Sequence, residues 1–467
     1  MTERPSQPAS RRQLVLLLVI PTLIGLTLRL MAAQGDYWLD EAWSAVFARE
    51  ARTPGRVFFA INHDNNHYLN TLWLQLVGWS APPMLGRAAS IACGTASIAV
   101  AGLIGARRGT AAAALAAMLF AVSPILVTYG AEARGYAPML LALLVAIRLV
   151  DQQLWGTPLR WAPQLLGVIT LLGMLGHGSM LFGVVALTGW AAVEYARRMP
   201  FRAALNATIL LMGRSVAAVA AVALLALIAA LTSPAGFRMG SRTAFSGEAL
   251  LDALAYMAGF TLGWPFGVSL GLAALLLMPM MLARATALRD RAPFYLLAIP
   301  GLPLAVALLQ PINSAFPRYY LLSSIALLLL TADLLVAARG RARWIAGGIF
   351  AALIASSIVV DLRIIRNLRG DPGVAITAMA RRAPAAAAAI AGSPRDSAVL
   401  KTAAAAHGYK LRIDEDCSNA RFLFIERDGG RPLPPIDRRC DATFVPIAAG
   451  RVEGLSGMDW QIYERTR

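Results

Sequence analysis

A long apolar run and the polar segment after it decide how this sequence is interpreted. Residues 14–33 read LVLLLVIPTLIGLTLRLMAA, and residues 36–44 read DYWLDEAWS. The apolar run is long enough to cross a membrane as a helix. In the polar segment, Asp40 and Glu41 lie among tryptophans, which favour the membrane–water interface, whereas carboxylates are costly at membrane depth. We therefore expect Asp40 and Glu41 at the membrane surface; a pair of solvated loop acids is the alternative.

The composition is that of a polytopic membrane protein with a less apolar tail. Of the 467 residues, 58% are hydrophobic and 15% charged, and the mean hydropathy is +0.59. Soluble chains are about 45–50% apolar and about 25% charged. The formal charge of +17 lies largely in short loops between apolar runs, so the positive-inside rule explains it better than nucleic-acid binding. Almost all of it is arginine; Lys401 and Lys410 are the only lysines, which indicates compositional bias without functional weight.

Apolar runs predict about eleven membrane spans, several of them short. The segment 249–262 is also apolar, but Asp252 and Gly259 interrupt it, and we expect an interfacial or re-entrant helix there. The predicted spans cover residues 14–33, 86–105, 111–127, 137–150, 162–176, 179–193, 208–231, 266–283, 293–309, 320–337 and 344–360.

Arginine clusters give the orientation of these spans. If the spans alternate, the clusters all fall on one side, which the positive-inside rule makes cytoplasmic. The opposite side then carries a first outer loop, residues 34–85, and the tail. We therefore expect a membrane domain over residues 1–360 and a small extracytoplasmic α/β domain over 361–467.

Within the tail, short apolar pieces predict strands, and two other segments predict helices. The strands are expected at residues 397–400, 421–425, 442–446 and 460–463, and the helices at 374–391 and 401–409. Two cysteines in an exported domain, Cys417 and Cys440, suggest a disulfide, with two unrelated thiols as the alternative.

Polar side chains gather in the first outer loop, where residues 62–70 read NHDNNHYLN. Such donors and acceptors can bind the hydroxyls of a sugar, and Asn66 and His67 are candidates for this. His63, Asp64 and His67 also have a spacing that could hold a metal ion on a helix. A polar loop that caps the bundle is the alternative.

Charged side chains recur at the outer ends of later spans. Glu132 and Arg134 precede one span, Arg318 precedes another, and Arg87 opens the second. Arginine suits a phosphate because it is always charged and can bond two oxygens at once. Internal ion pairs or interfacial anchors are the alternatives. The sequence contains no P-loop or nucleophile elbow, so nucleotide-driven chemistry is unsupported.

Taken together, these motifs resemble the family 39-type glycosyltransferases of the GT-C class. This family includes protein O-mannosyltransferases and the bacterial aminoarabinose–lipid A transferases. The resemblance is strongest over residues 14–150. The chain departs from the family at one place: many relatives have His-Pro-Pro where this chain has Asn65-Asn66-His67. It rests on Leu39-Asp40-Glu41-Ala42, His67-Tyr68, Arg87, Glu132-Ala133-Arg134-Gly135-Tyr136-Ala137 and Pro317-Arg318-Tyr319.

The resemblance implies a GT-C-like helical bundle in a bacterial inner membrane and an inverting transfer of a sugar from a polyprenyl-phosphate carrier. The acceptor would be an extracytoplasmic lipid, glycan or protein. Asp40 would be the general base, and Glu41 would hold the acceptor or tune Asp40. Arg134 and Arg318 would stabilise the departing phosphate. The remaining contacts to sugar or phosphate would come from His67, Asn66, Glu132 and Arg87.

Several points stay open at this level. A divalent metal cofactor is not decided, and neither are the sugar, the acceptor or the oligomeric state. A transporter or flippase of a lipid-linked sugar, an O-antigen ligase-like enzyme and a non-catalytic membrane scaffold are the rival classes. Transporters usually place ionisable groups near the bilayer midplane, whereas those here are predicted at outer ends, which favours an enzyme.

The predicted orientation can be tested directly. A reporter that fluoresces only in the cytoplasm, fused after Arg467, should be dark, because the arginine clusters place the tail on the other side. The same reporter inserted after Arg198 should be bright. Fluorescence from the fusion after Arg467 would contradict both the topology and an outer location for Asp40.

Overall fold

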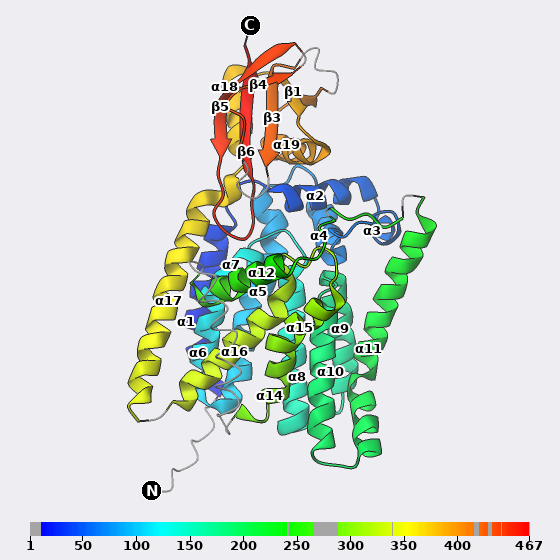
Figure 1. Cartoon of the computed structure of the whole chain (residues 1–467), viewed down its shortest axis with the longest axis vertical. Coiled ribbons are helices and arrows are strands. Elements are labelled where there is room, and N and C mark those ends of the chain that lie inside the picture. Colours follow the sequence, from blue (N-terminus) through cyan, green and yellow to red (C-terminus); the bar gives the residue numbers. More distant parts are fainter. Residues whose placement is uncertain are drawn as a thin grey trace.

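A bundle of apolar helices carries a small sheet domain at one end (Figure 1). This computed structural model describes residues 11–234, 236–240, 242–264, 288–338, 340–414, 420–427, 432–439 and 441–466. The start of α1 at Arg11 and the sheet domain lie at opposite ends of the bundle, and we call the sheet-domain end the outer end. The predicted fold class, a helical membrane bundle with a small α/β tail, is confirmed.

Among the described residues, seven helical segments are long and apolar enough to cross a membrane. There are eight if the bent pair α6–α7, which turns by 61° at Ser123-Pro124, counts as one span. Helices α9 and α10 are apolar but shorter, and the predicted span 266–283 lies outside the described residues. The count of about eleven is therefore reached only if those three also cross.

The bundle helices match the predicted runs closely along the chain. They are α1 (Arg11–Ala32), α5 (Pro83–Gly105), α6 (Thr110–Val122), α7 (Pro124–Gly130), α8 (Tyr136–Trp155), α9 (Ala162–Gly176), α10 (Met180–Ala196), α11 (Phe201–Thr232), α14 (Ala292–Leu296), α15 (Leu302–Leu309), α16 (Leu321–Ala337) and α17 (Ala342–Asn367).

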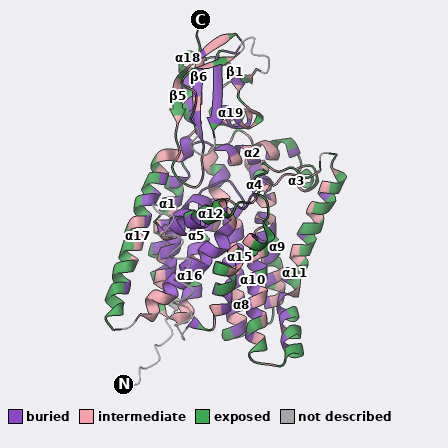
Figure 2. Cartoon of the chain, in the orientation of Figure 1, coloured by how far each residue is buried: buried purple, intermediate pink, exposed green. Residues whose placement is uncertain are grey.

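The outward faces of the peripheral helices are apolar and exposed. Figure 2 shows exposed residues along α11 and α17, and they include Leu210, Leu231, Trp344 and Ile345. Apolar surface of this extent would be costly in water and is stable against lipid tails. Together with the long apolar helices, it makes the chain a multi-pass membrane protein.

A layer of helices lies across the outer end of the bundle, beneath the sheet domain (Figure 1). The first outer loop supplies α2 (Leu39–Ala51), α3 (Pro54–Phe59) and α4 (Tyr68–Val77). The segment predicted as an interfacial or re-entrant helix is α12 (Gly247–Leu262), which also runs across the bundle. The side chain of Ser246 caps its first turn by accepting from the Ala249 amide.

The tail is a mixed six-stranded sheet of strand order β2-β1-β3-β6-β5-β4. Strand β1 pairs in parallel with β2 and β3, and the remaining pairs are antiparallel. The elements are α18 (Gly373–Arg382), β1 (Ala387–Ala391), α19 (Pro394–Ala406), β2 (Leu411–Ile413), β3 (Phe422–Arg427), β4 (Asp437–Arg439), β5 (Ala442–Gly450) and β6 (Asp459–Arg465).

Three of the four predicted tail strands are confirmed as β3, β5 and β6, and the fourth is wrong. Residues 397–400 lie inside α19, because Ser393 caps this helix and Pro394 opens it. The predicted helix over 374–391 is right only as far as Arg382, where α18 ends. Strand β1 follows and pairs with both β2 and β3. This pairing in the sheet overrides the helix propensity of its alanines. Cys417 and Cys440 lie outside the described residues.

The tail and the first outer loop share one hydrophobic core. Leu39, Ala42 and Ala45 of α2 are buried in the same cluster as Val399 and Ala403 of α19. A second connection is polar: Asp36 receives a hydrogen bond from His407 at 2.8 Å, and its amide donates to Asp371. The tail is therefore packed directly onto the helix that begins at Asp40.

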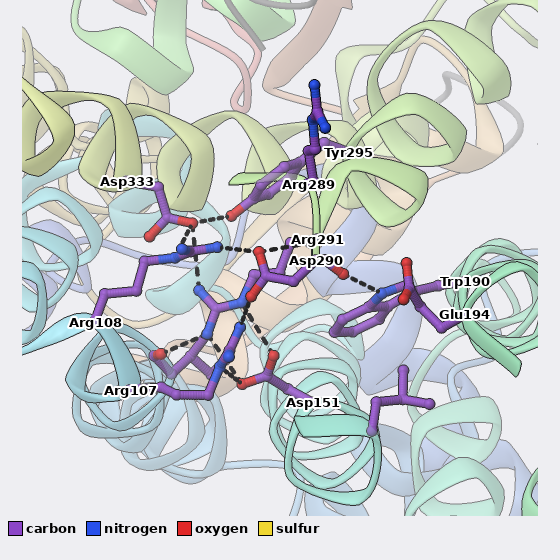
Figure 3. A network of polar contacts seen from close by, with 12 residues as sticks. Arg107, Arg108, Asp151, Trp190, Glu194, Arg289, Asp290, Arg291, Tyr295 and Asp333 are labelled. Carbon is purple, nitrogen blue, oxygen red and sulfur yellow. Dashed lines mark hydrogen bonds and ion pairs between the residues drawn. The ribbon is translucent and has the colours of Figure 1, made fainter. Parts of the chain in front are cut away.

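The inner end of the bundle is fastened by a network of ion pairs (Figure 3). Asp151 of α8 lies 2.7 Å from Arg107 and 3.0 Å from Arg291. Arg108 pairs with Asp290 at 2.7 Å and with Asp333 of α16 at 3.0 Å. Three arginines thus neutralise three aspartates, and the network joins helices that are far apart in sequence.

Removal of one buried charge from this network should be costly. Asp151→Asn leaves Arg107 and Arg291 short of a partner, and we expect a loss of about 3–5 kcal/mol. Thermal unfolding of the purified protein in detergent measures it. Asp252→Asn is the matched control, because Asp252 is exposed and is in none of the ion pairs between described residues; its shift should stay under about 0.5 kcal/mol. Equal shifts would contradict the role given to the network.

Candidate active site

Asp40 lies in the first turn of α2, at the outer end of the bundle. Trp38 precedes this helix in an extended conformation, and its amide donates to Glu41 Oε2 at 3.4 Å, which is one half of a capping box. Two acidic residues in the first turn also complement the helix dipole. The sequence therefore starts a helix here and fixes Asp40 at its N-terminal end.

Two arginines from distant loops meet the Asp40 carboxylate. Arg134 Nη1 lies 2.8 Å from Asp40 Oδ2, and Arg318 Nη1 lies 4.0 Å from the same oxygen. The Asp40 side chain is 22% exposed and that of Arg318 18%, so water and solutes can reach this group. With two guanidinium groups and one carboxylate, the cluster carries a net positive charge. The fold thus brings together three residues that the sequence analysis named separately.

Asn65 joins the cluster, although the sequence analysis selected its neighbour Asn66 instead. The Asn65 side chain accepts from Arg134 Nη2 at 2.7 Å and donates to the Asp40 carbonyl at 2.8 Å. Asn66 instead donates to the carbonyls of Val57 and Ile61 and holds the loop fold. Which of two adjacent asparagines faces the site depends on the loop path, and no signal in the sequence distinguishes them.

His67 presents an unused donor to this region. Its Nδ1 accepts from the Gly135 amide at 3.1 Å, so the ring proton is assigned to Nε2. Burial, together with the charge of Arg134, lowers the pKa of His67 well below its ordinary value, so the ring is neutral at pH 7. Nε2 is buried and has no hydrogen-bond partner among the described residues.

Two aromatic rings surround His67. The rings of Tyr136 and His177 lie 5.5 and 4.9 Å from it, and the guanidinium of Arg134 lies 4.8 Å from the centre of the Tyr136 ring. The Nδ1 of His177 accepts from the Ser179 amide at 3.1 Å. Burial and the charge of Arg134 lower its pKa to about 3, so it too is neutral.

Three donors of the cluster are buried without a partner among the described residues. They are His67 Nε2, Arg134 Nε and Arg318 Nε. An unsatisfied buried donor is costly, and such groups in a native fold call for a ligand, an ion or water. Arg134 and Arg318 flank the Asp40 carboxylate, and His67 lies within the field of both arginines. Donors from three separate loops in one region fit a ligand with several acceptor oxygens.

Glu41 is a structural hub rather than a contact for a ligand. Its carboxylate forms a bidentate pair with Arg87, at 2.8 and 2.6 Å, and accepts from the Ala133 amide at 2.7 Å. Both side chains of the pair are fully buried. Burial opposes the ionisation of Glu41, but the charge and hydrogen bonds of Arg87 outweigh it and lower the pKa of Glu41. The sequence prediction that Glu41 and Arg87 contact acceptor or phosphate is therefore corrected.

Glu132 also faces away from Asp40. Its carboxylate lies 3.6 Å from Arg369 Nε, and burial raises its pKa, an effect that Arg369 only partly offsets. Arg369 stands in the linker after α17, where its backbone is left-handed, with φ of 57°. It donates to the carbonyls of Ala32, Thr128 and Ala131. Arg369 was not singled out from the sequence, because an arginine in a linker usually lies in solvent.

The loop that carries Arg134 comes very close to a second backbone. A Cβ built on Gly135 would lie 1.8 Å from the Gly176 carbonyl oxygen, so only glycine fits there. The same loop is held from the other side by Asn70, which donates to the Ala133 carbonyl at 2.7 Å. Arg134 is thus presented by a rigid turn.

The metal candidates of the first outer loop do not converge. His63 pairs with Asp64 at 2.8 Å and packs against Trp43, whereas His67 bonds the Gly135 amide. In the part of the chain that the structure describes, no group of three or more His, Cys, Asp or Glu side chains could hold a metal ion. These three residues therefore do not fit a shared metal site.

Among solved structures, the chain is similar to the oligosaccharyltransferase of Archaeoglobus fulgidus tethered to an acceptor peptide with the NVT sequon. The TM-score is 0.46 at 13% sequence identity, over 89% of this chain and 69% of that one. Archaeal AglB from the same organism, in complex with an inhibitory peptide and a dolichol-phosphate, gives a TM-score of 0.46 and 13% identity over 88% and 69%. No protein-family model and no curated protein matches the chain. This degree of likeness does not establish a common fold, so we infer function from the side chains of the site.

The hub role of Glu41 makes a prediction about stability. Glu41→Gln keeps the shape of the side chain but leaves Arg87 buried without a countercharge, and we expect a loss of about 3–5 kcal/mol in thermal unfolding. Glu50→Gln is the matched control on the same helix, because Glu50 is exposed and in no ion pair between described residues. Wild-type stability of Glu41→Gln would contradict the hub role.

Proposed function

We propose that the chain is a membrane glycosyltransferase that moves a sugar from a lipid-phosphate carrier to an acceptor at the outer end of the bundle. The observation that carries this proposal is the set of unpaired donors from His67, Arg134 and Arg318, of which the two arginines flank a partly exposed carboxylate. A phosphate supplies several acceptor oxygens and a negative charge, and arginines bind it strongly.

In the proposed reaction Asp40 is the general base. An acceptor hydroxyl gives its proton to Asp40 as its oxygen attacks C1 of the sugar, and the bond from C1 to the phosphate oxygen breaks. The carrier phosphate leaves with that bonding pair, and attack from the opposite face inverts C1. Arg134 and Arg318 offset the charge that builds on the phosphate.

The ion pair between Asp40 and Arg134 has a role in this scheme. Before the carrier binds, the Asp40 carboxylate is paired with Arg134 at 2.8 Å. An incoming phosphate competes for Arg134 and Arg318, which frees Asp40 to accept a proton. Asn65 contacts both Asp40 and Arg134, and so holds the two groups in register while the partner of Arg134 changes.

The finer assignment is part of the same proposal. We place the protein with the family 39-type GT-C enzymes, on the motifs of its sequence, in a bacterial inner membrane with the tail extracytoplasmic. The carrier would be a polyprenyl phosphate. Among the described residues no group of side chains fits a metal site, and no step of the proposed reaction uses a metal ion. Glu41, Arg87 and Glu132 position the reacting loops, and Asn66 holds the first outer loop.

The central prediction concerns Asp40. Asp40→Asn should reduce sugar transfer by about 10²–10⁴-fold, because an amide of the same shape cannot accept the proton. Binding of polyprenyl phosphate should not weaken, since loss of the carboxylate leaves Arg134 and Arg318 free for the phosphate. Transfer from a polyprenyl-phosphate sugar by purified protein and binding of the lipid are measured in parallel.

Arg318→Ala is the complementary variant in the same assay. It should weaken binding of the lipid phosphate as well as transfer, because Arg318 is partly exposed and has an unpaired donor. Wild-type transfer by Asp40→Asn would show that the base is elsewhere. Wild-type protein that transfers no sugar but moves a solute across vesicles would replace the enzyme with a transporter.

A further inference from the structure

A second polar feature lies between the first outer loop and the tail, away from Asp40. It is a cavity of about 520 Å³ between the C-terminal half of α2, the segment after α4, and the α19–β2 edge of the tail. Four basic side chains line it: Arg49, Lys401, Lys410 and Arg412. We call it the basic cleft.

Few acidic side chains of the described residues pair with the charges of the basic cleft. Arg412 has a distant partner in Asp414, at 3.7 Å. Arg49, Lys401 and Lys410 are in none of the ion pairs between described residues. Surface cations are common in this chain, but here four of them line one open hollow, so that their fields add there. The cleft therefore attracts anions.

Two aromatic residues, Trp79 and Tyr409, also line the cleft. The guanidinium of Arg49 stacks over the Trp79 ring, 4.5 Å from its centre. The Tyr409 hydroxyl donates to the Ala383 carbonyl at 2.7 Å, which fixes its ring. An aromatic face can pack against the apolar C–H face of a sugar ring, and a stacked arginine keeps its edge donors available.

Both lysines of the 467-residue chain meet in this cleft. Lys401 lies on α19 and Lys410 just before β2, and Arg49 approaches them from the first outer loop. The sequence alone gave the two lysines no functional weight. The packing of α19 on α2 in the shared core brings Arg49 to the two lysines.

We propose that the basic cleft binds an anionic sugar, one that carries a phosphate or a carboxylate. The cations hold the anionic group, and Trp79 with Tyr409 packs against the ring. Arg49 follows Asp40 by nine residues along α2, which corresponds to about 14 Å and to the opposite face of the helix. The ligand is therefore not the sugar being transferred. Resting on the proposed function, we assign it as a remote part of an extended glycan acceptor.

The test uses the full chain in nanodiscs of phosphatidylcholine and titration with glucose 1-phosphate, with glucose as the neutral probe. Wild-type protein should bind glucose 1-phosphate and not glucose, and more weakly as salt is raised. Lys401→Gln/Lys410→Gln should weaken binding about tenfold, which corresponds to about 1.4 kcal/mol. Arg438→Gln/Arg465→Gln is the matched control, since both arginines are exposed and lie on strands of the other half of the sheet.

The outcomes separate this proposal from the catalytic one. Arg318→Ala should leave binding of glucose 1-phosphate to the cleft intact. If Arg318→Ala loses this binding and Lys401→Gln/Lys410→Gln keeps it, the probe binds next to Asp40, and the proposal of a binding site in the cleft is overturned. Absence of binding to wild type, or equal binding by both double variants, would also overturn it. If the cleft binds glucose 1-phosphate but Asp40→Asn transfers sugar at the wild-type rate, the assignment of Asp40 as the base is wrong, whereas the proposal of an anionic-sugar site in the cleft is supported.

A last arm distinguishes a glycan from a lipid head group, which has the same phosphate chemistry. The titration is repeated in nanodiscs of phosphatidylcholine mixed with phosphatidylglycerol. Binding of glucose 1-phosphate should persist at a similar affinity. If the anionic lipid abolishes it in wild type, a head group occupies the cleft, and the assignment to a glycan is overturned.

Discussion

The buried ion pair between Glu41 and Arg87 is the constraint on which the outer end of this protein depends. Arg87 also donates to the carbonyls of Ala33, Gly35 and Asp36, and Glu41 accepts from the Ala133 amide. One pair thus fixes the end of the first membrane helix, the start of α2 and the loop of Arg134. Two charges removed from water persist only with such complete hydrogen bonding, so these three segments cannot move independently.

The tail is part of the same construction. Arg369, in the linker, reaches the carbonyls beneath the Arg134 loop, and α19 buries its apolar face against α2. The tail therefore acts as a support for the loops that carry Asp40 and Arg134, and it also forms one wall of the basic cleft. A domain that lacks every sequence motif of the candidate site still contributes to its geometry.

The division of charges at the outer end follows from burial. Fully buried groups such as Glu41 and Arg87 are paired with each other, because an unpaired buried charge would destabilise the fold. Asp40 and Arg318 keep part of their surface in contact with solvent, and the donors around them are incompletely satisfied. Groups that are partly exposed or lack a hydrogen-bond partner are the ones that can bind a ligand.

The sequence by itself determined the membrane bundle, the α/β tail and the outer location of Asp40, because the cost of burying charge and the interface preference of tryptophan are local properties of a segment. It also selected Asp40, Arg134 and Arg318 as candidate site residues, and the fold brings these three side chains together. Only the tertiary structure decided that Asn65 rather than Asn66 faces the site, that Glu41 and Glu132 turn to Arg87 and Arg369, and that Lys401 and Lys410 meet Arg49. The partner of a charged side chain depends on which loops meet in space, and that is set by packing between segments far apart in the chain.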